Sequence, residues 1–400
     1  MENKNCFFPA DILVPQGNLN KWSVIACDQY TSEPEYWEKV KEITEGEPSA
    51  LNIILPECYL KEDNSGSIKK INENMNKYLE EGIFKEYRNA MVYIERVQCD
   101  GKLRCGVLGC IDLEQYSYEQ KTNAPVRATE QTVISRIPPR VEIRRDAPLE
   151  LPHIMLLIDD IKREIIEPLA LKKQNFEKIY DFELMLKAGR ITGYLIDSET
   201  VKEIRQKLSK LAENNGGLAF CVGDGNHSLA TARECYLKNR SELCRYALCE
   251  FVNVHSDALC FEPIYRVVFG TDPKALTDAF VNFCGGEYSG DDAQEFKCFY
   301  EGCERTVSVR PKYKLSVGTL QAFLDSYCSD KPEMKIDYIH GEESLKKLSE
   351  IKGAVGFIFG GMKKEELFPA VLKDGSLPRK TFSMGHSDDK RFYLEARKIK

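Results

Sequence analysis

The chain has 400 residues, of which 42% are hydrophobic and 30% are charged, as in ordinary soluble globular proteins. At roughly 150 residues per domain, this length predicts two or three domains. The 63 acidic residues outnumber the 56 Lys and Arg residues, and the net charge is −7. This composition argues against a disordered tail, a collagen-like fibre and a coiled coil. It also disfavours a general nucleic-acid coat, whose surface would be strongly basic.

Apolar runs are short throughout the chain. The longest, at 154–158, 218–222 and 354–359, fall far short of the ~20 residues that a membrane-spanning helix needs. The first residues lack the basic start and apolar run of a signal peptide, so we expect a cytoplasmic protein with no membrane partner. The 15 Cys residues include no Cys-x-x-Cys pair. We therefore interpret most of them as small buried hydrophobic residues.

The first half of the chain predicts both strands and helices. Short strands are expected at 18–25 and at 51–55, and a helix start is expected near Pro34. Apolar residues recur at helical spacing from Ser67 until Gly82 ends the pattern, which predicts an amphipathic helix. Strands at 91–98 and 103–112 flank Asp100-Gly101, a hairpin turn signal. Residues 153–169 carry an apolar pattern that fits a strand or a helix.

The second half continues the mixture. A helix over 201–211 precedes a buried strand at 218–223 and a second helix at 229–237, and strands follow at 246–254 and 264–269. Further strands (306–309, 355–359) and helices (274–283, 342–351) complete the chain. The hairpin argues against an all-parallel sheet. We predict a mixed α/β fold, with one region over 1–250 and a smaller α/β region over 251–400.

The stretch from Cys221 to Ala232 carries the most chemical information. A buried strand enters a turn in which Gly223 and Gly225 allow backbone conformations that other residues resist. The helix that follows offers unpaired N–H groups and a positive dipole end, which predicts a phosphate site with Asn226, His227 and Ser228 at its entrance. Asp224 could hold a metal ion or orient a substrate hydroxyl. The turn lacks the lysine of a Walker A loop, and a simple helix cap made by Asp224 or Asn226 explains it equally well.

This stretch resembles the Asp-Gly-His-His-Arg…Glu-Thr-Ala motif of a widespread bacterial and archaeal family, the domain of unknown function numbered one thousand and fifteen. Four other segments resemble that family in order. They are 127–132 (Arg-x-His-Glu-x-Thr in the family), 261–268 (Leu-x-Pro-x-His-Arg-Val-Val), 337–341 (Tyr-x-His-Gly) and 377–382 (Pro-x-Lys-Ser-Thr). The resemblance therefore runs along nearly the whole chain.

The resemblance implies a ParB/sulfiredoxin-like nucleotide-binding region, because the family is often linked to that fold. Free serine kinases of the same superfamily carry a similar turn. The implied function is therefore phosphoryl transfer from ATP or ADP, with Mg²⁺, to a small hydroxyl-bearing metabolite such as serine. This chain departs from the family pattern at four positions, where Thr129, Asn226 and Tyr265 replace histidines and Ser228 replaces an arginine. These changes predict a different substrate or a reduced activity.

The resemblance also selects candidate site residues. Glu130 would act as a base or Mg²⁺ ligand, Asp224 as a second ligand and His227 as a third catalytic group. The candidate phosphate contacts outside the turn are Arg127, Arg140, Arg266 and Lys380. Each has a simpler interpretation, as a solvated loop residue or as a member of a surface ion pair.

Three functional hypotheses remain open. The leading one is an ATP-dependent phosphotransferase, the second is a non-catalytic nucleotide sensor, and the third is a ParB-like DNA-associated protein. The expected partner is a small-molecule substrate. The acidic net charge disfavours nucleic acid, and homo-oligomerisation is left open.

Overall fold

The computed structural model describes residues 5–385 and 387–400, and the chain divides into two compact units. Unit 1 contains the chain up to Leu259 together with its end from Gly385, and unit 2 spans Cys260–Met384. The expected division between residues 250 and 251 falls inside strand β14 (Tyr246–Asn253). The smaller region expected over 251–400 does not form one unit, because the last residues of the chain bury apolar side chains in unit 1.

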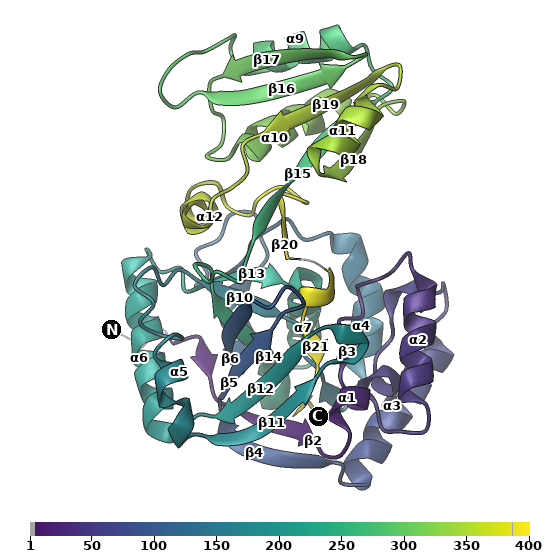
Figure 1. Ribbon diagram of the computed structural model, residues 1–400, viewed down its shortest axis with the longest axis vertical. Helices are drawn as coiled ribbons and strands as arrows, with labels where there is room; N and C mark the ends of the chain where they lie inside the picture. The colour runs from purple at the N-terminus through teal and green to yellow at the C-terminus, as the bar shows by residue number, and fades with distance from the viewer. Residues whose placement is uncertain (1–4, 386) are drawn as a thin grey trace. The chain divides into compact units, whose positions relative to one another are not determined.

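A large mixed sheet forms the centre of unit 1 (Figure 1). Its β5–β6 pair is antiparallel, with Val97 opposite Leu103, which confirms the predicted hairpin. The β10–β14 and β8–β13 pairs are parallel, so the predicted mixed α/β class is confirmed. The strand order is β11 (Glu177–Glu183), β12 (Arg190–Leu195), β5 (Val92–Val97), β6 (Leu103–Asp112), β14, β10 (Met155–Ile158), β13 (Phe220–Asp224), β8 (Val126–Ala128) and β7 (Tyr116–Ser117), with β1 (Phe7–Phe8) paired to β6.

The sheet is buried on both faces. Successive side chains of a strand alternate between faces, so Ile94 and Leu248 enter one hydrophobic cluster while Tyr93 and Cys249 enter another. Helices α6 (Ser198–Asn214) and α7 (Asn226–Lys238) contribute apolar residues to the second cluster and cover that face. This two-sided burial explains why the central strands are nearly continuous apolar runs in the sequence.

Small ladders and helices build the rest of unit 1. The ladders pair β2 (Ala10–Pro15) with β4 (Phe84–Ala90), β3 (Val24–Ile25) with β21 (Phe392–Tyr393), and β9 (Leu149–Glu150) with β22 (Arg397–Lys398). The helices are α1 (Leu19–Trp22), α2 (Pro34–Thr44), α3 (Ser65–Glu80), α4 (Ile137–Arg145), α5 (Leu169–Lys172) and α8 (Glu242–Arg245).

The predicted strand at 51–55 is wrong, and the one at 18–25 is confirmed only at Val24–Ile25, because Leu19–Trp22 forms helix α1. Ala50–Ile53 forms a 3₁₀ helix instead, because the side chain of Ser49 accepts a hydrogen bond from the backbone N–H of Leu51 and caps a turn there. Ala50 and Ile53 are nevertheless buried, so the apolar run predicts burial correctly but predicts the wrong secondary structure.

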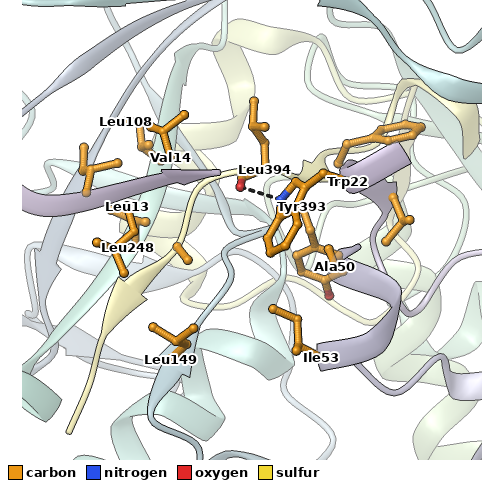
Figure 2. Packing of buried hydrophobic residues seen from close by; sticks show 14 of the residues in the cluster. Leu13, Val14, Trp22, Ala50, Ile53, Leu108, Leu149, Leu248, Tyr393 and Leu394 are labelled. Carbon is orange, nitrogen blue, oxygen red and sulfur yellow. Dashed lines mark hydrogen bonds between the residues drawn. The ribbon is translucent and has the colours of Figure 1, made fainter. Parts of the chain in front are cut away.

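The end of the chain is part of the core of unit 1. Figure 2 shows Tyr393 and Leu394 among side chains from the first 53 residues and from the central sheet. The indole Nε1 of Trp22 donates to the carbonyl oxygen of Leu394 at 2.9 Å, and Leu394 is fully buried. The β3–β21 and β9–β22 ladders add backbone hydrogen bonds. These contacts join the two ends of the chain within one core.

Unit 2 has its own antiparallel sheet and its own core. Phe280 packs against Phe296, Phe323 and Phe357 at its centre. The strand order is β17 (Cys303–Val309), β16 (Gln294–Tyr300), β19 (Ala354–Phe359), β15 (Phe261–Phe269) and β18 (Lys335–His340), and β20 (Phe382–Met384) pairs with the start of β15. The helices are α9 (Pro273–Phe283), α10 (Ser316–Cys328), α11 (Glu342–Ser349) and α12 (Leu367–Asp374).

The structure confirms a mixed α/β chain, whereas the ParB/sulfiredoxin-like assignment stays a prediction. Over residues 5–385 and 387–400, each helix is too short or too polar to cross a lipid bilayer.

We expect Leu394→Ala to destabilise unit 1 by about 2–5 kcal/mol, because it removes a fully buried side chain and leaves a cavity. Urea unfolding followed by Trp fluorescence measures the change. Leu171→Ala is the matched control, because Leu171 is 82% exposed, and it should shift stability by less than about 0.5 kcal/mol. Equal effects of the two variants would contradict a core role for the chain end.

Candidate functional site

The predicted strand–turn–helix is confirmed. β13 ends at Asp224, α7 begins at Asn226, and Gly225 joins them with a φ of 79° in the left-handed region. A Cβ atom on Gly225 would lie 3.0 Å from the Cα of Ile154, so glycine is required there for both conformation and space. The N–H of Leu229 makes the first intrahelical bond, to the carbonyl of Gly225 at 3.0 Å. The N–H groups of residues 226–228 therefore point out of the first turn, as the ordinary geometry of a helix start requires.

The two carboxylates chosen from the sequence lie at one edge of the sheet. β8 runs parallel to β13 with Ala128 opposite Val222, so the two strands end at the same edge. Asp224 ends β13, and the half-buried Glu130 follows the end of β8. The N–H of Val133 donates to Nε2 of His227 at 3.2 Å, which ties the segment after Glu130 to the first turn of α7.

Asp224 forms an ion pair that the sequence did not suggest. Its Oδ2 lies 3.1 Å from Nζ of Lys390, and its Oδ1 accepts a hydrogen bond from the N–H of Gly225 at 2.8 Å. The two charged side chains are only 19% and 17% exposed. Burial raises the pKa of Asp224, but the charge of Lys390 and the hydrogen bonds from Lys390 and the Gly225 N–H lower it by more, so the net pKa is below its usual value. Asp224 is therefore a carboxylate at neutral pH.

His153 links the turn to the end of the chain. Its Nε2 lies 2.9 Å from Oγ of Ser228, and its Nδ1 lies 2.9 Å from the hydroxyl of Tyr393. His153 and Tyr393 are 7% and 3% exposed. The Tyr393 hydroxyl also accepts a hydrogen bond from the N–H of Cys27 at 3.3 Å. Ser228 is thus hydrogen-bonded to a ring whose position is set by buried groups.

His227 is held in its neutral form. Burial, followed by the nearby charges of Arg140 and Arg136, lowers its pKa to about 4. Because Nε2 accepts the hydrogen bond from Val133, the ring proton belongs on Nδ1. Only Nδ1 can then donate to an anion, so the predicted role of His227 as a phosphate donor is restricted to that atom.

The two arginines expected from unit 1 already have partners. Arg127 lies in β8, is 7% exposed and donates through Nε to the carbonyl of Ala124 at 2.8 Å. Arg140 lies in α4, pairs with Glu57 and donates to the carbonyl of Arg136 at 2.8 Å. Helix α4 packs against α7, which explains why Arg140 affects His227.

Arg266 and Lys380 belong to unit 2. The guanidinium of Arg266 is fully buried there and donates to the side chain of Gln321 at 2.8 Å and to the carbonyls of Arg379 and Lys380 at 3.0 and 2.9 Å. Its carbon also lies 4.6 Å from the ring centroid of Tyr338. These hydrogen bonds make Arg266 an interior residue of unit 2. The candidate site is built from residues of unit 1 alone.

The oxygen atoms around the turn suit a hard cation. Glu130 and Asp224 provide carboxylates, and the buried Oδ1 of Asn226 has no hydrogen-bond partner within residues 5–385 and 387–400. The same described residues contain no cluster of three or more His, Cys, Asp or Glu side chains placed to hold a metal ion.

Sequence reasoning missed three residues of the site, namely His153, Lys390 and Tyr393. No local motif marks them. Lys390 and Tyr393 lie near the end of the chain, and they reach Asp224 and His153 respectively because that end packs into unit 1.

We expect His227 to titrate near pH 4 rather than near 6.5. Since folding lowers this pKa, the stability that the neutral ring contributes is complete above about pH 6.5 and is lost as the pH falls towards 4. Imidazole ¹⁵N NMR should show the proton on Nδ1 at pH 7, and His227→Gln should flatten the pH dependence of unfolding in that window. A midpoint near 6.5 in the folded protein would contradict the buried, neutral assignment.

Comparison with known proteins places the chain in a family. No curated protein matches it in sequence. Among solved structures, a free serine kinase variant in complex with ADP is 12% identical, with a TM-score of 0.41, covering 74% of this chain and 93% of that chain. A conserved hypothetical protein from Pyrococcus furiosus is 12% identical, with a TM-score of 0.37 and coverages of 72% and 94%. SbnI from Staphylococcus aureus, with a C-terminal truncation, is 8% identical, with a TM-score of 0.39 and coverages of 70% and 82%. The model of the family described as "Protein of unknown function (DUF1015)" matches residues 9–329, and the chain therefore belongs to that family.

Proposed function

We propose that the protein is a nucleotide-dependent phosphotransferase that acts on a small hydroxyl-bearing metabolite, with free serine as the first substrate to test. The observation that carries the proposal is the Asp224–Lys390 ion pair at the N-terminal end of α7, on the sheet edge where Glu130 also lies. A site for phosphoryl transfer needs fixed positive groups for the phosphates and a carboxylate for the metal or the nucleophile. This edge of unit 1 supplies both.

The phosphates of ATP or ADP bind at the start of α7 in this proposal. The N–H groups of residues 226–228 and the positive end of the helix dipole favour negative charge there. Lys390 adds a full positive charge close by. The family arginine is replaced by Ser228, and Lys390 compensates for that loss with a cation from another part of the chain.

Glu130 and Asp224 would hold Mg²⁺ together with the phosphates, since Mg²⁺ in such sites uses one or two carboxylates and keeps phosphate and water oxygens as its other ligands. When bound, the ion would neutralise charge that develops on the transferred group. Glu130 would accept the proton of the substrate hydroxyl, because its carboxylate lies at the same edge of the sheet as the turn.

A non-catalytic nucleotide sensor is the second candidate. Arg140 is already paired with Glu57, and Ser228 replaces the family arginine. Fast phosphoryl transfer commonly uses guanidinium groups that can bind the phosphates, and the turn lacks these two. This alternative predicts nucleotide binding without turnover. Measuring binding and turnover for the same nucleotides separates the two candidates.

We expect Asp224→Asn to weaken binding of Mg·ATP at least about tenfold, because it removes one of the two carboxylates that would hold Mg²⁺. Glu130→Gln should reduce the rate of transfer about 10²-fold with a smaller effect on affinity, as expected for loss of a general base. Isothermal titration and a phosphate-transfer assay over a panel of metabolites provide the two measurements.

Glu119→Gln is the control for these variants, since Glu119 is an exposed carboxylate of unit 1. Wild-type protein that binds neither ATP nor ADP in the presence of Mg²⁺ would refute the proposal. Binding that is unaffected by Asp224→Asn would remove this turn from it.

Lys390→Gln should reduce affinity for Mg·ATP about tenfold, because a charge-assisted contact to phosphate is lost. Lys69→Gln is the matched control, because Lys69 lies on α3 with 79% of its side chain exposed. Equal affinities of the two variants, measured by titration, would show that Lys390 serves the ion pair alone.

A further inference from the structure

Ser228 has the surroundings of an activated hydroxyl. It lies in the first turn of α7, and its Oγ is 2.9 Å from Nε2 of His153. On the other side of the ring, Nδ1 is 2.9 Å from the hydroxyl of Tyr393, whose ring meets the imidazole edge-on at a centroid distance of 5.4 Å. Ser228, His153 and Tyr393 thus form a nucleophile, a base and a group that orients the base.

Tyr393 orients the imidazole but does not exchange protons with it. Burial, followed by the nearby Cys27 thiol, holds the pKa of Tyr393 well above its usual value, so the phenol keeps its proton. When the ring proton of His153 lies on Nδ1 and is donated to the Tyr393 oxygen, the lone pair of Nε2 faces Ser228. In that tautomer His153 can take the hydroxyl proton.

The surroundings of Ser228 would also stabilise a phosphate ester. A phosphoserine in the first turn of a helix is favoured by the free N–H groups and by the helix dipole. Lys390, whose Nζ lies 3.1 Å from Oδ2 of Asp224, places an ammonium group near the same turn. The arginine found at this position in the family motif could not form such an ester.

We propose that Ser228 accepts the phosphoryl group from the nucleotide and passes it to the metabolite, so that transfer proceeds through a phosphoserine. This inference rests on the proposed function and deepens it, because it makes the reaction a double displacement. It assigns Ser228 as the nucleophile, His153 as its base and Tyr393 as a positioning residue.

In the first step, Ser228 Oγ attacks the terminal phosphorus of ATP. The Oγ–P bond forms, the bond from phosphorus to the bridging oxygen breaks, ADP leaves, and the Ser228 proton moves to Nε2 of His153. In the second step, the metabolite oxygen attacks the phosphoserine and the Oγ–P bond breaks. The proton on His153 returns to Ser228, and Glu130 takes the proton of the metabolite hydroxyl.

The test incubates the full chain with Mg²⁺ and ATP labelled with ³²P at the terminal phosphate, without metabolite. We expect acid-stable label, located at Ser228 by peptide mass spectrometry, that is lost when serine is then added. Ser228→Ala should abolish the label, His153→Gln should slow labelling about 10²-fold, and Tyr393→Phe should slow it less. Ser228→Thr keeps a hydroxyl and should retain slow labelling if the alanine variant does not fold.

Ser198→Ala is the matched control, because Ser198 is an exposed serine in the first turn of α6, and it should label like wild type. Wild-type protein that binds Mg·ATP but forms no phosphoserine at position 228 would overturn this inference and leave the proposed function standing. Wild-type protein that binds no nucleotide would overturn both. Labelling that His153→Gln leaves unchanged would overturn the assignment of the base.

Discussion

The candidate site depends on one buried interaction, the insertion of Arg391 between two carboxylates. Its Nε donates to Glu250 at 2.8 Å, its Nη2 donates to Glu395 at 2.8 Å, and its Nη1 donates to the carbonyl of Pro152 at 2.8 Å. Arg391 and its two carboxylates are each at most 3% exposed. Removing Arg391 would leave two buried carboxylates without the cation they share, which is costly in a protein interior.

This interaction positions the groups on either side of Arg391. Lys390, the preceding residue, reaches Asp224, and Tyr393, two residues later, reaches His153. Arg391 donates to the carbonyl of Pro152, the residue immediately before His153, so the same guanidinium holds the backbone next to both His153 and Tyr393. The ionic interaction in the core and the chemistry at the turn are therefore linked through the backbone.

Two arginines of the unit 1 sheet also contact the end of the chain. Arg96 and Arg104 stand opposite each other on β5 and β6, where like charges repel. They donate to the carbonyls of Asp388 and Asp389 at 3.0 and 2.7 Å. Burial, followed by the charge of Arg104, lowers the pKa of Arg96 to about 9. The chain end thus supplies one backbone acceptor to each of these buried guanidinium groups, while the Nε atom of each has no hydrogen-bond partner among the described residues.

The sequence by itself determined the elements that depend on local interactions. Hydrophobic alternation, the Asp100-Gly101 turn and the glycines at 223 and 225 predict the hairpin, the buried strands and the strand–turn–helix, because each depends on neighbours within a few residues. Asp224 was found from the turn itself and Glu130 through the family resemblance, and the parallel β8–β13 pair places them at one edge. Only the tertiary structure decided that Lys390, Tyr393 and His153 meet at the turn, that Arg266 is an interior residue of unit 2, and that the chain end belongs to unit 1. Those outcomes depend on which distant segments bury their apolar and charged side chains together, and a pattern of neighbouring residues carries no record of such long-range pairing.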